Sequence, residues 1–263
     1  MLPVYEASAF KGIIRFGGHT KPWVVMVRTE DGPVPYVVKL FKKDSNNEKG
    51  CIENEVIGSV LAKEFNLVVP KAALIHFSND FLYRLPPEAL ISLNLADSRI
   101  KFGTKLIEPA DPFYPEISKD LLQSRISIDT AFAFDNLIRN RDRGSKPNMF
   151  FSNKQAYLID HEFAFERIEQ GLKDIKNNQW DKCFLEWHAF YDILSRSTKT
   201  SRSQYFDEFQ EYLKFLNLKS LNLYFTQLES HGYASRRQLI MPYLSEMKSN
   251  SSTFVSLLKT LLT

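Results

Sequence analysis

Apolar and polar residues alternate through residues 7–43, and β-branched side chains are frequent there. This period of two, with turn residues at Gly17-Gly18 and Asp31-Gly32-Pro33, predicts short strands separated by reversals of the chain. The predicted strands are residues 13–16, 23–27 and 36–40.

Further along the chain the period changes. Apolar residues at helical spacing predict helices over residues 54–64 and 128–138, and Ile128, Ala131, Phe132, Asp135 and Ile138 share one face of the second. Apolar runs predict strands at residues 72–77, 102–107, 149–152 and 156–159, the last two joined by a turn at Asn153-Lys154-Gln155. From about Glu162 the pattern is helical and rich in aromatic residues, of which Trp180, Phe184, Trp187 and Phe190 are expected in the core.

The fold class that these elements predict is α+β, with a β-rich N-terminal lobe over residues 1–108 and a mainly helical lobe over residues 109–263. Hydrophobic residues make up 44% of the 263 residues and charged residues 25%, values typical of a water-soluble globular protein. No apolar run has membrane-crossing length, and the first residues do not resemble a signal peptide. With two cysteines there is no disulfide framework, so we expect a cytoplasmic protein without a membrane partner.

The net charge of +3 is small, and no basic run resembles a surface that follows a phosphate backbone, so direct nucleic-acid binding is not expected. The five histidines are widely scattered, without the spacing of metal ligands.

The most informative segment is the polar run from Asn140 to Asn148, followed by an apolar run that ends at Asp160. Phosphoryl transfer needs one carboxylate beside the acceptor hydroxyl, and a carboxylate and an amide oxygen as ligands for magnesium. Asp142, Asn148 and Asp160 supply these groups in the order that kinase-like catalytic loops use. The same residue types also occur in ordinary exposed turns and strand ends, so that alternative stays open.

A second group of candidates lies in the β-rich part. Lys39 interrupts an apolar strand and needs a carboxylate or a solvent-facing position, and Glu55 on the following helix is the expected partner. Gly17, Gly18 and Thr20 lie between the first two strands, where backbone amides could fold over phosphates. The alternatives are that both charges are simply exposed and that the glycine pair only reverses the chain.

Together these motifs resemble the HipA-like kinases, relatives of the phosphoinositide kinases. The resemblance extends from Phe16 to about Phe165 and depends on Gly-Gly-His-Thr-Lys-Pro-Trp, Tyr-Val-Val-Lys, Asn-Glu, Phe-Asp-Asn-Leu-Ile-Arg-Asn-Arg-Asp-Arg, Asn-Met-Phe and Leu-Ile-Asp-His-Glu-Phe-Ala-Phe.

The resemblance implies a two-lobed serine/threonine kinase that uses ATP and Mg²⁺, with a protein substrate and an antitoxin-like protein as partners. The resemblance further implies that ATP binds in the cleft between the lobes, with the adenine near Leu106, Ile107 and Glu108. Lys39 contacts the phosphates and Glu55 orients it. Asp142 is the catalytic carboxylate, and Asn148 and Asp160 hold the metal.

The chain departs from the family pattern within the loop. Gly144 stands where members usually have a histidine, and the interval from Asp142 to Asn148 is one residue longer than usual. Because catalysis depends on positioning, two alternatives to an active enzyme stay open. One is a nucleotide-binding pseudokinase that acts as a regulatory module, and the other is a purely structural or interaction protein.

Overall fold

The chain forms two compact units. The structure is a computed structural model that describes residues 1–263 except 15–20, 114–116, 145–147 and 182–186. The β-rich unit contains Met1–Val56, Pro70–Glu108 and Leu223–Ser235, and the helical unit contains Ile57–Val69, Pro109–Asn222 and Arg236–Thr263. The predicted α+β class, with a β-rich N-terminal region and a helical C-terminal region, is therefore confirmed.

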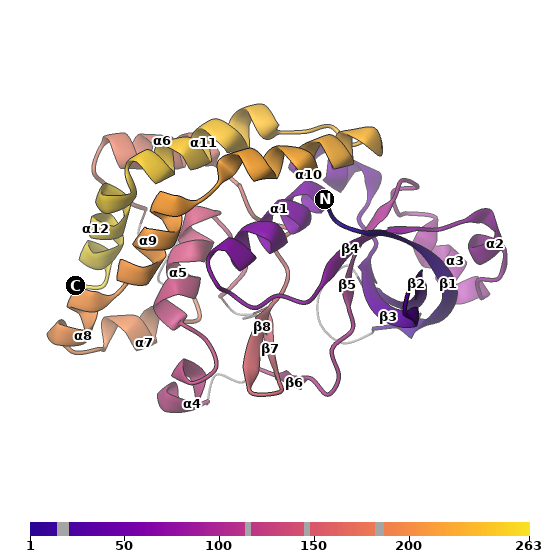
Figure 1. Ribbon diagram of the computed structural model, residues 1–263, viewed down its shortest axis with the longest axis horizontal. Coiled ribbons are helices and arrows are strands. Elements are labelled where there is room, and N and C mark those ends of the chain that lie inside the picture. Colours follow the sequence, from indigo (N-terminus) through magenta and orange to yellow (C-terminus); the bar gives the residue numbers. More distant parts are fainter. Residues whose placement is uncertain (15–20, 114–116, 145–147, 182–186) are drawn as a thin grey trace. The chain divides into compact units, whose positions relative to one another are not determined.

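Five strands of the β-rich unit close into a barrel in the order β1-β2-β3-β5-β4. Each pair is antiparallel except β1 and β4, which run parallel. The strands are β1 (Val4–Ile13), β2 (Trp23–Thr29), β3 (Gly32–Lys39), β4 (Ala72–His76) and β5 (Lys101–Lys105), and the helical segments are η1 (Ser45–Lys49), α1 (Cys51–Glu64, which continues into the helical unit), α2 (Asn79–Tyr83) and α3 (Pro87–Leu93) (Figure 1).

Every second side chain of β2 points into the interior of this barrel. Trp23, Val25 and Val27 occupy every second position of β2, and all three are fully buried. In the antiparallel register Trp23 lies opposite Val38 and Val25 lies opposite Tyr36, so the apolar faces of β2 and β3 point the same way. The residues between them, Val24 and Met26 in β2 and Val37 in β3, are also apolar but only half-buried.

Two strand predictions need correction. The first strand was expected at residues 13–16, of which 15 and 16 lie outside the described part of the chain. The structure has β1 at Val4–Ile13, where its bonds to β4 pair Val4 with Leu74. That pairing joins segments far apart in the chain, which a local pattern cannot reveal. The strand expected at residues 102–107 ends at Lys105, although the amide of Leu106 still donates to the carbonyl of Pro35 at 2.9 Å.

A segment from late in the chain belongs to the β-rich unit. The amide side chain of Gln227 pairs with the backbone of Leu2, accepting from its N–H at 2.9 Å and donating to its carbonyl at 2.8 Å. The hydroxyl of Tyr233 donates to the carbonyl of Ile100 at 2.6 Å, and its ring lies under the guanidinium of Arg99. These contacts satisfy buried backbone groups that would otherwise be costly.

The helical unit combines helices with a three-stranded sheet of order β6-β7-β8. The turn between β7 and β8 has two residues, Asn153 and Lys154, with φ of 46° and 63°. Left-handed conformation at both positions is what tight hairpins require, so the predicted hairpin is confirmed. The strands are β6 (Asp111–Pro112), β7 (Met149–Ser152) and β8 (Gln155–Leu158), and the helices are α4 (Lys119–Gln123), α5 (Ile128–Leu137), α6 (Ile168–Lys176), α7 (Tyr191–Ser195), α8 (Lys199–Gln204), α9 (Asp207–Phe215), α10 (Leu218–Ser230, shared with the β-rich unit), α11 (Arg237–Ser249) and α12 (Ser251–Leu261).

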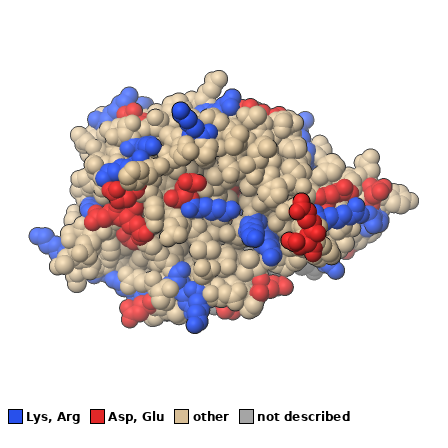
Figure 2. All heavy atoms as spheres, in the orientation of Figure 1, with Lys and Arg blue, Asp and Glu red and all other residues tan. Residues whose placement is uncertain are grey.

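Aromatic side chains form the centre of the helical unit. Phe65, just after α1, stacks on Phe209 of α9 with ring centroids 4.9 Å apart and lies 5.6 Å from Phe134 of α5. All three are fully buried. At the surface, basic and acidic side chains are mixed on the face of the molecule shown in Figure 2. Among the described residues, no helix has the length and apolar character needed to cross a bilayer.

Replacing Phe65 with alanine should destabilise the protein by about 3–5 kcal/mol, because it removes a buried ring that joins two helices. Urea denaturation measures this change. Phe215→Ala is the matched control, because Phe215 is 81% exposed and its loss should change stability by less than about 0.5 kcal/mol. Equal effects of the two substitutions would contradict this assignment of the core.

Candidate functional site

Lys39 and Glu55 form an ion pair within the β-rich unit. Lys39 is the last residue of β3 and Glu55 lies in the first turns of α1, and their side chains are 15% and 2% exposed. The expected contact is therefore present, because a buried carboxylate needs a positive partner and the neighbouring strand end supplies it. The ammonium also lies 5.7 Å from the centroid of the Phe41 ring.

The structure shows no contacts that would support the other nucleotide-binding candidates among its described residues. Ile107 and Glu108 follow the end of β5, where Ile107 is half-buried and Glu108 is exposed. Gly17, Gly18 and Thr20 lie outside the described residues. The role of these five residues stays a prediction.

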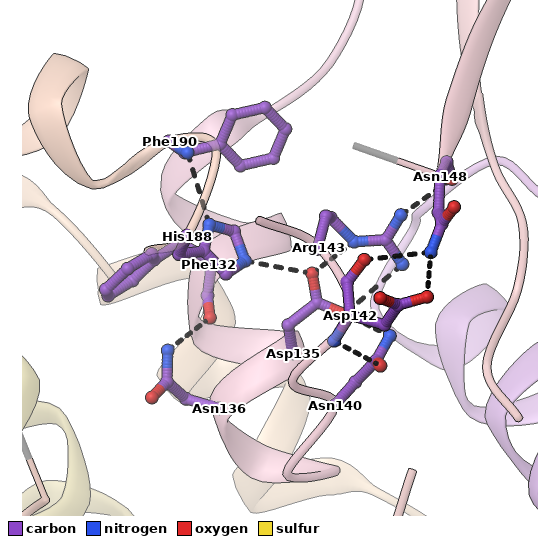
Figure 3. Close-up of polar contacts among 9 residues, drawn as sticks. All are labelled: Phe132, Asp135, Asn136, Asn140, Asp142, Arg143, Asn148, His188 and Phe190. Atoms are coloured by element: carbon purple, nitrogen blue, oxygen red, sulfur yellow. Dashed lines mark hydrogen bonds and ion pairs between the residues drawn. The ribbon is translucent and has the colours of Figure 1, made fainter. Parts of the chain in front are cut away.

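In the helical unit, Asp142 and Asn148 are in direct contact. The amide nitrogen of Asn148 donates to the carboxylate of Asp142 at 2.9 Å and to its carbonyl at 2.8 Å (Figure 3). Both groups of Asp142 that Asn148 contacts are oxygen acceptors, so the side-chain amide of Asn148 must turn its nitrogen, not its oxygen, towards Asp142. The amide oxygen of Asn148 then faces away from Asp142, and an amide oxygen is a hard ligand of the kind that Mg²⁺ accepts. The side chain of Asn148 therefore suits a metal ligand that also steadies the carboxylate beside it.

The β7-β8 hairpin carries Asp160 to the same end of the sheet as Asn148. Met149 pairs with Leu158, and the amide of Ile159 donates to the carbonyl of Asn148 at 2.9 Å. Asp160 is the next residue, so the hairpin places the two candidate metal ligands on adjacent strand ends. Both have positive φ, 45° for Asn148 and 65° for Asp160, a conformation that Asn and Asp tolerate better than most residues.

The segment after Asp160 is held against α1. A Cβ on Gly58 would lie 2.6 Å from the Cβ of His161, so only glycine allows this approach. His161 is buried, and its ring contacts the edge of Phe134. The backbone that follows Asp160 is thereby fixed by packing against two helices.

The loop itself is anchored by a buried carboxylate, Asp135 of α5. Its oxygens accept from the guanidinium of Arg143, with which it forms an ion pair, and both side chains are fully buried. Asn140 also donates to Asp135 at 3.3 Å, and its own amide oxygen accepts from the backbone N–H of Asp142 at 3.3 Å. Arg143 donates in turn to the carbonyl of Asn148 at 2.7 Å. One buried carboxylate thus orients both ends of the loop (Figure 3).

His188 completes this network from the segment before α7. Its Nδ1 accepts from the backbone N–H of Phe190 at 3.2 Å, so the proton of the neutral ring lies on Nε2, which donates to Asp135 at 3.1 Å. Burial lowers the pKa of His188 below its ordinary value of 6.5, although Asp135 opposes this. Burial alone would raise the pKa of Asp135, but the charge of Arg143 and the hydrogen bond from His188 outweigh it and hold the value at about 2.

Sequence reasoning placed Asp135 on the apolar face of its helix but gave it no role. An aspartate on the apolar face of a helix is expected to be buried, and a buried carboxylate needs a positively charged or hydrogen-bonding partner. The position of Asp135 in the sequence therefore already indicated such a partner. Its partners, Arg143 and His188, lie eight and 53 residues along the chain, and neither could be assigned from local pattern.

The chain matches the HipA-like kinase family over residues 15–217, more than half of its length, and it belongs to that family. This membership confirms the resemblance seen in the sequence and supports a phosphotransferase. Among solved structures, the Helicobacter pylori proinflammatory kinase CtkA has a TM-score of 0.46 and 12% sequence identity, with 95% of each chain covered. No curated protein matches the chain.

Asp135→Ala should destabilise the protein by about 3–5 kcal/mol, because it removes the carboxylate that the buried guanidinium of Arg143 faces. Denaturant unfolding measures the loss. Asp192→Ala removes an exposed carboxylate that also pairs with an arginine, and should cost only a small fraction of that amount. Similar losses in both variants would show that the buried pair does not organise the fold.

Stability should fall as the pH drops below about 6.5, because His188 resists protonation when folded but not when unfolded. A histidine whose pKa is lower in the folded protein than in the unfolded protein favours folding at pH values above the unfolded pKa. This contribution to the free energy of unfolding is lost as the pH falls towards the folded pKa. His188→Gln should therefore flatten the dependence of unfolding free energy on pH between about 7 and 5, by at most about 1.4 kcal/mol per pH unit. An unchanged slope in His188→Gln would contradict the role given to this buried histidine.

Proposed function

We propose that the protein is an ATP- and magnesium-dependent serine/threonine kinase that transfers the γ-phosphoryl group to a protein hydroxyl. The observation that carries the proposal is the contact between Asn148 and Asp142, which joins a candidate metal ligand to a candidate catalytic carboxylate. The lengthened loop, which differs from the family pattern, still brings these two side chains together. Membership of the HipA-like kinase family supports the same reaction class.

Each residue has a role in this proposal. Asp142 orients the acceptor hydroxyl and takes its proton as the oxygen attacks phosphorus, and the bond to the β-phosphate oxygen breaks to release ADP. Asn148, through its amide oxygen, and Asp160, through its carboxylate, hold Mg²⁺, which neutralises charge on the phosphates when bound. Lys39, oriented by Glu55, contacts the phosphates.

The remaining nucleotide contacts follow from the family resemblance. The backbone of Gly17 and Gly18, with Thr20, covers the phosphates, and Ile107 and Glu108 lie beside the adenine. In this proposal residues 1–108 supply nucleotide contacts and residues 109–263 supply the catalytic and metal-binding groups. An antitoxin-like protein partner and a cytoplasmic location stay predictions.

A regulatory pseudokinase is the second candidate. The observation that favours it is Gly144, which stands where family members usually have a histidine and where the backbone of Trp187 now lies. In this case nucleotide binds to the same residues, but no phosphoryl transfer follows.

Asp142→Asn separates the two candidates. In an active kinase the substitution removes the proton acceptor, so transfer of labelled phosphate should fall by a factor on the order of one hundred or more, while ATP affinity changes little. Transfer is measured to the protein itself and to generic protein substrates, and affinity by calorimetry with magnesium.

Asp192→Asn, at an exposed position of α7, is the matched control and should leave transfer unchanged. If the native protein binds ATP but transfers nothing, the pseudokinase proposal replaces the kinase proposal. If it does not bind ATP in the presence of magnesium, both fail.

A further inference from the structure

Trp187 is exposed, whereas the other two tryptophans are buried. It is 80% exposed, and Trp23 and Trp180 are 0% and 6% exposed. The sequence led us to expect Trp187 in the core, and this expectation was wrong, because the segment before α7 buries His188 and Phe190 and leaves Trp187 outside. Tryptophan is among the residues that most often anchor protein–protein contacts when a partner covers them.

The backbone of Trp187 is held firmly against the catalytic loop. A Cβ on Gly144 would lie 2.5 Å from the carbonyl oxygen of Trp187 and 3.6 Å from its Cβ, so glycine is needed for this approach. The amide of Ala189 donates to the carbonyl of Arg143 at 2.7 Å, and His188 donates to Asp135. Trp187 is therefore an exposed side chain on a fixed backbone.

This position is close to the proposed catalytic carboxylate. Gly144 is two residues from Asp142, and two residues span at most about 7 Å. Any acceptor that presents its hydroxyl to Asp142 must bring its neighbouring residues into the same region. Trp187, which packs against Gly144, is therefore near the residues that would flank such an acceptor.

We propose that Trp187 recognises the acceptor, by packing against an apolar side chain that flanks the phosphorylated serine or threonine of a protein. The inference rests on the proposed function and adds a specificity determinant to it. A protein acceptor suits this geometry better than a bilayer, because one well-held aromatic residue can dominate a protein contact, whereas stable membrane attachment needs a wide apolar face or a second anchor.

Two tryptophan-free peptide mixtures test the proposal. Both contain a fixed serine between degenerate positions, and one has leucine at a flanking position where the other has glycine. The native protein should phosphorylate the leucine mixture on the order of tenfold more efficiently. Trp187→Ala should abolish this preference, with the KM for ATP and the melting temperature unchanged, and Trp187→Phe should retain most of it. A preference that survives in Trp187→Ala would overturn the proposal.

A second measurement does not depend on transfer. Because Trp23 and Trp180 are buried, acrylamide quenching of fluorescence reports mainly on Trp187. With Mg²⁺ and ADP present, the leucine mixture should protect Trp187 from acrylamide more than the glycine mixture does.

The two measurements separate the inference from the proposed function. If the protein transfers no phosphate but the leucine mixture still protects Trp187, the kinase proposal fails and peptide recognition stands. If neither mixture protects it, the inference fails, whatever the transfer assay shows. Protection by vesicles of phosphatidylcholine and phosphatidylserine, without protection by peptides, would also overturn it and assign the indole to a membrane surface.

Discussion

The buried ion pair between Asp135 and Arg143 is the interaction on which the candidate site depends. Both side chains are inaccessible to solvent, so neither charge is stabilised by water. Such a pair is tolerated only when further hydrogen bonds satisfy the remaining donors and acceptors. Here Asn140 and His188 donate to Asp135, and Arg143 donates to the carbonyl of Asn148. The hydrogen bonds that satisfy the pair therefore also determine the path of the loop.

This requirement explains why the loop keeps its two candidate site residues, Asp142 and Asn148, together despite its unusual sequence. Arg143 holds the backbone at Asn148, and Asn140 holds the backbone at Asp142. The side chains of Asp142 and Asn148 then meet directly. Gly144 fits the same network, because the backbone of Trp187 occupies the space beside it. The glycine that replaces the histidine of the family pattern thus allows the backbone of Trp187 to pack closely against the loop.

The sequence predicted the elements whose pattern is local. The β-branched apolar run at residues 23–27 identified a strand, and the turn at Asn153 and Lys154 identified the hairpin that carries Asp160. The pairing of Lys39 with Glu55 was accessible because a lysine in an apolar strand needs a partner.

What could not be predicted depends on contacts between distant segments. Closure of the barrel through β1 and β4, and the pairing of Gln227 with Leu2, leave no local trace in the pattern. For the same reason the interaction of His188 with Asp135 was missed, and with it the reason why Trp187 is exposed.

In the proposed kinase, Asn148 and Asp160 bind one metal ion while Asn148 keeps its contact with Asp142. A crystal structure with Mg²⁺ and a non-hydrolysable ATP analogue tests this most directly. We expect one ion with the amide oxygen of Asn148 and a carboxylate oxygen of Asp160 both at about 2.0–2.1 Å, and the amide nitrogen of Asn148 still bonded to Asp142. An ion coordinated by other residues, with Asn148 turned away from it, would show that these two side chains are not the metal ligands.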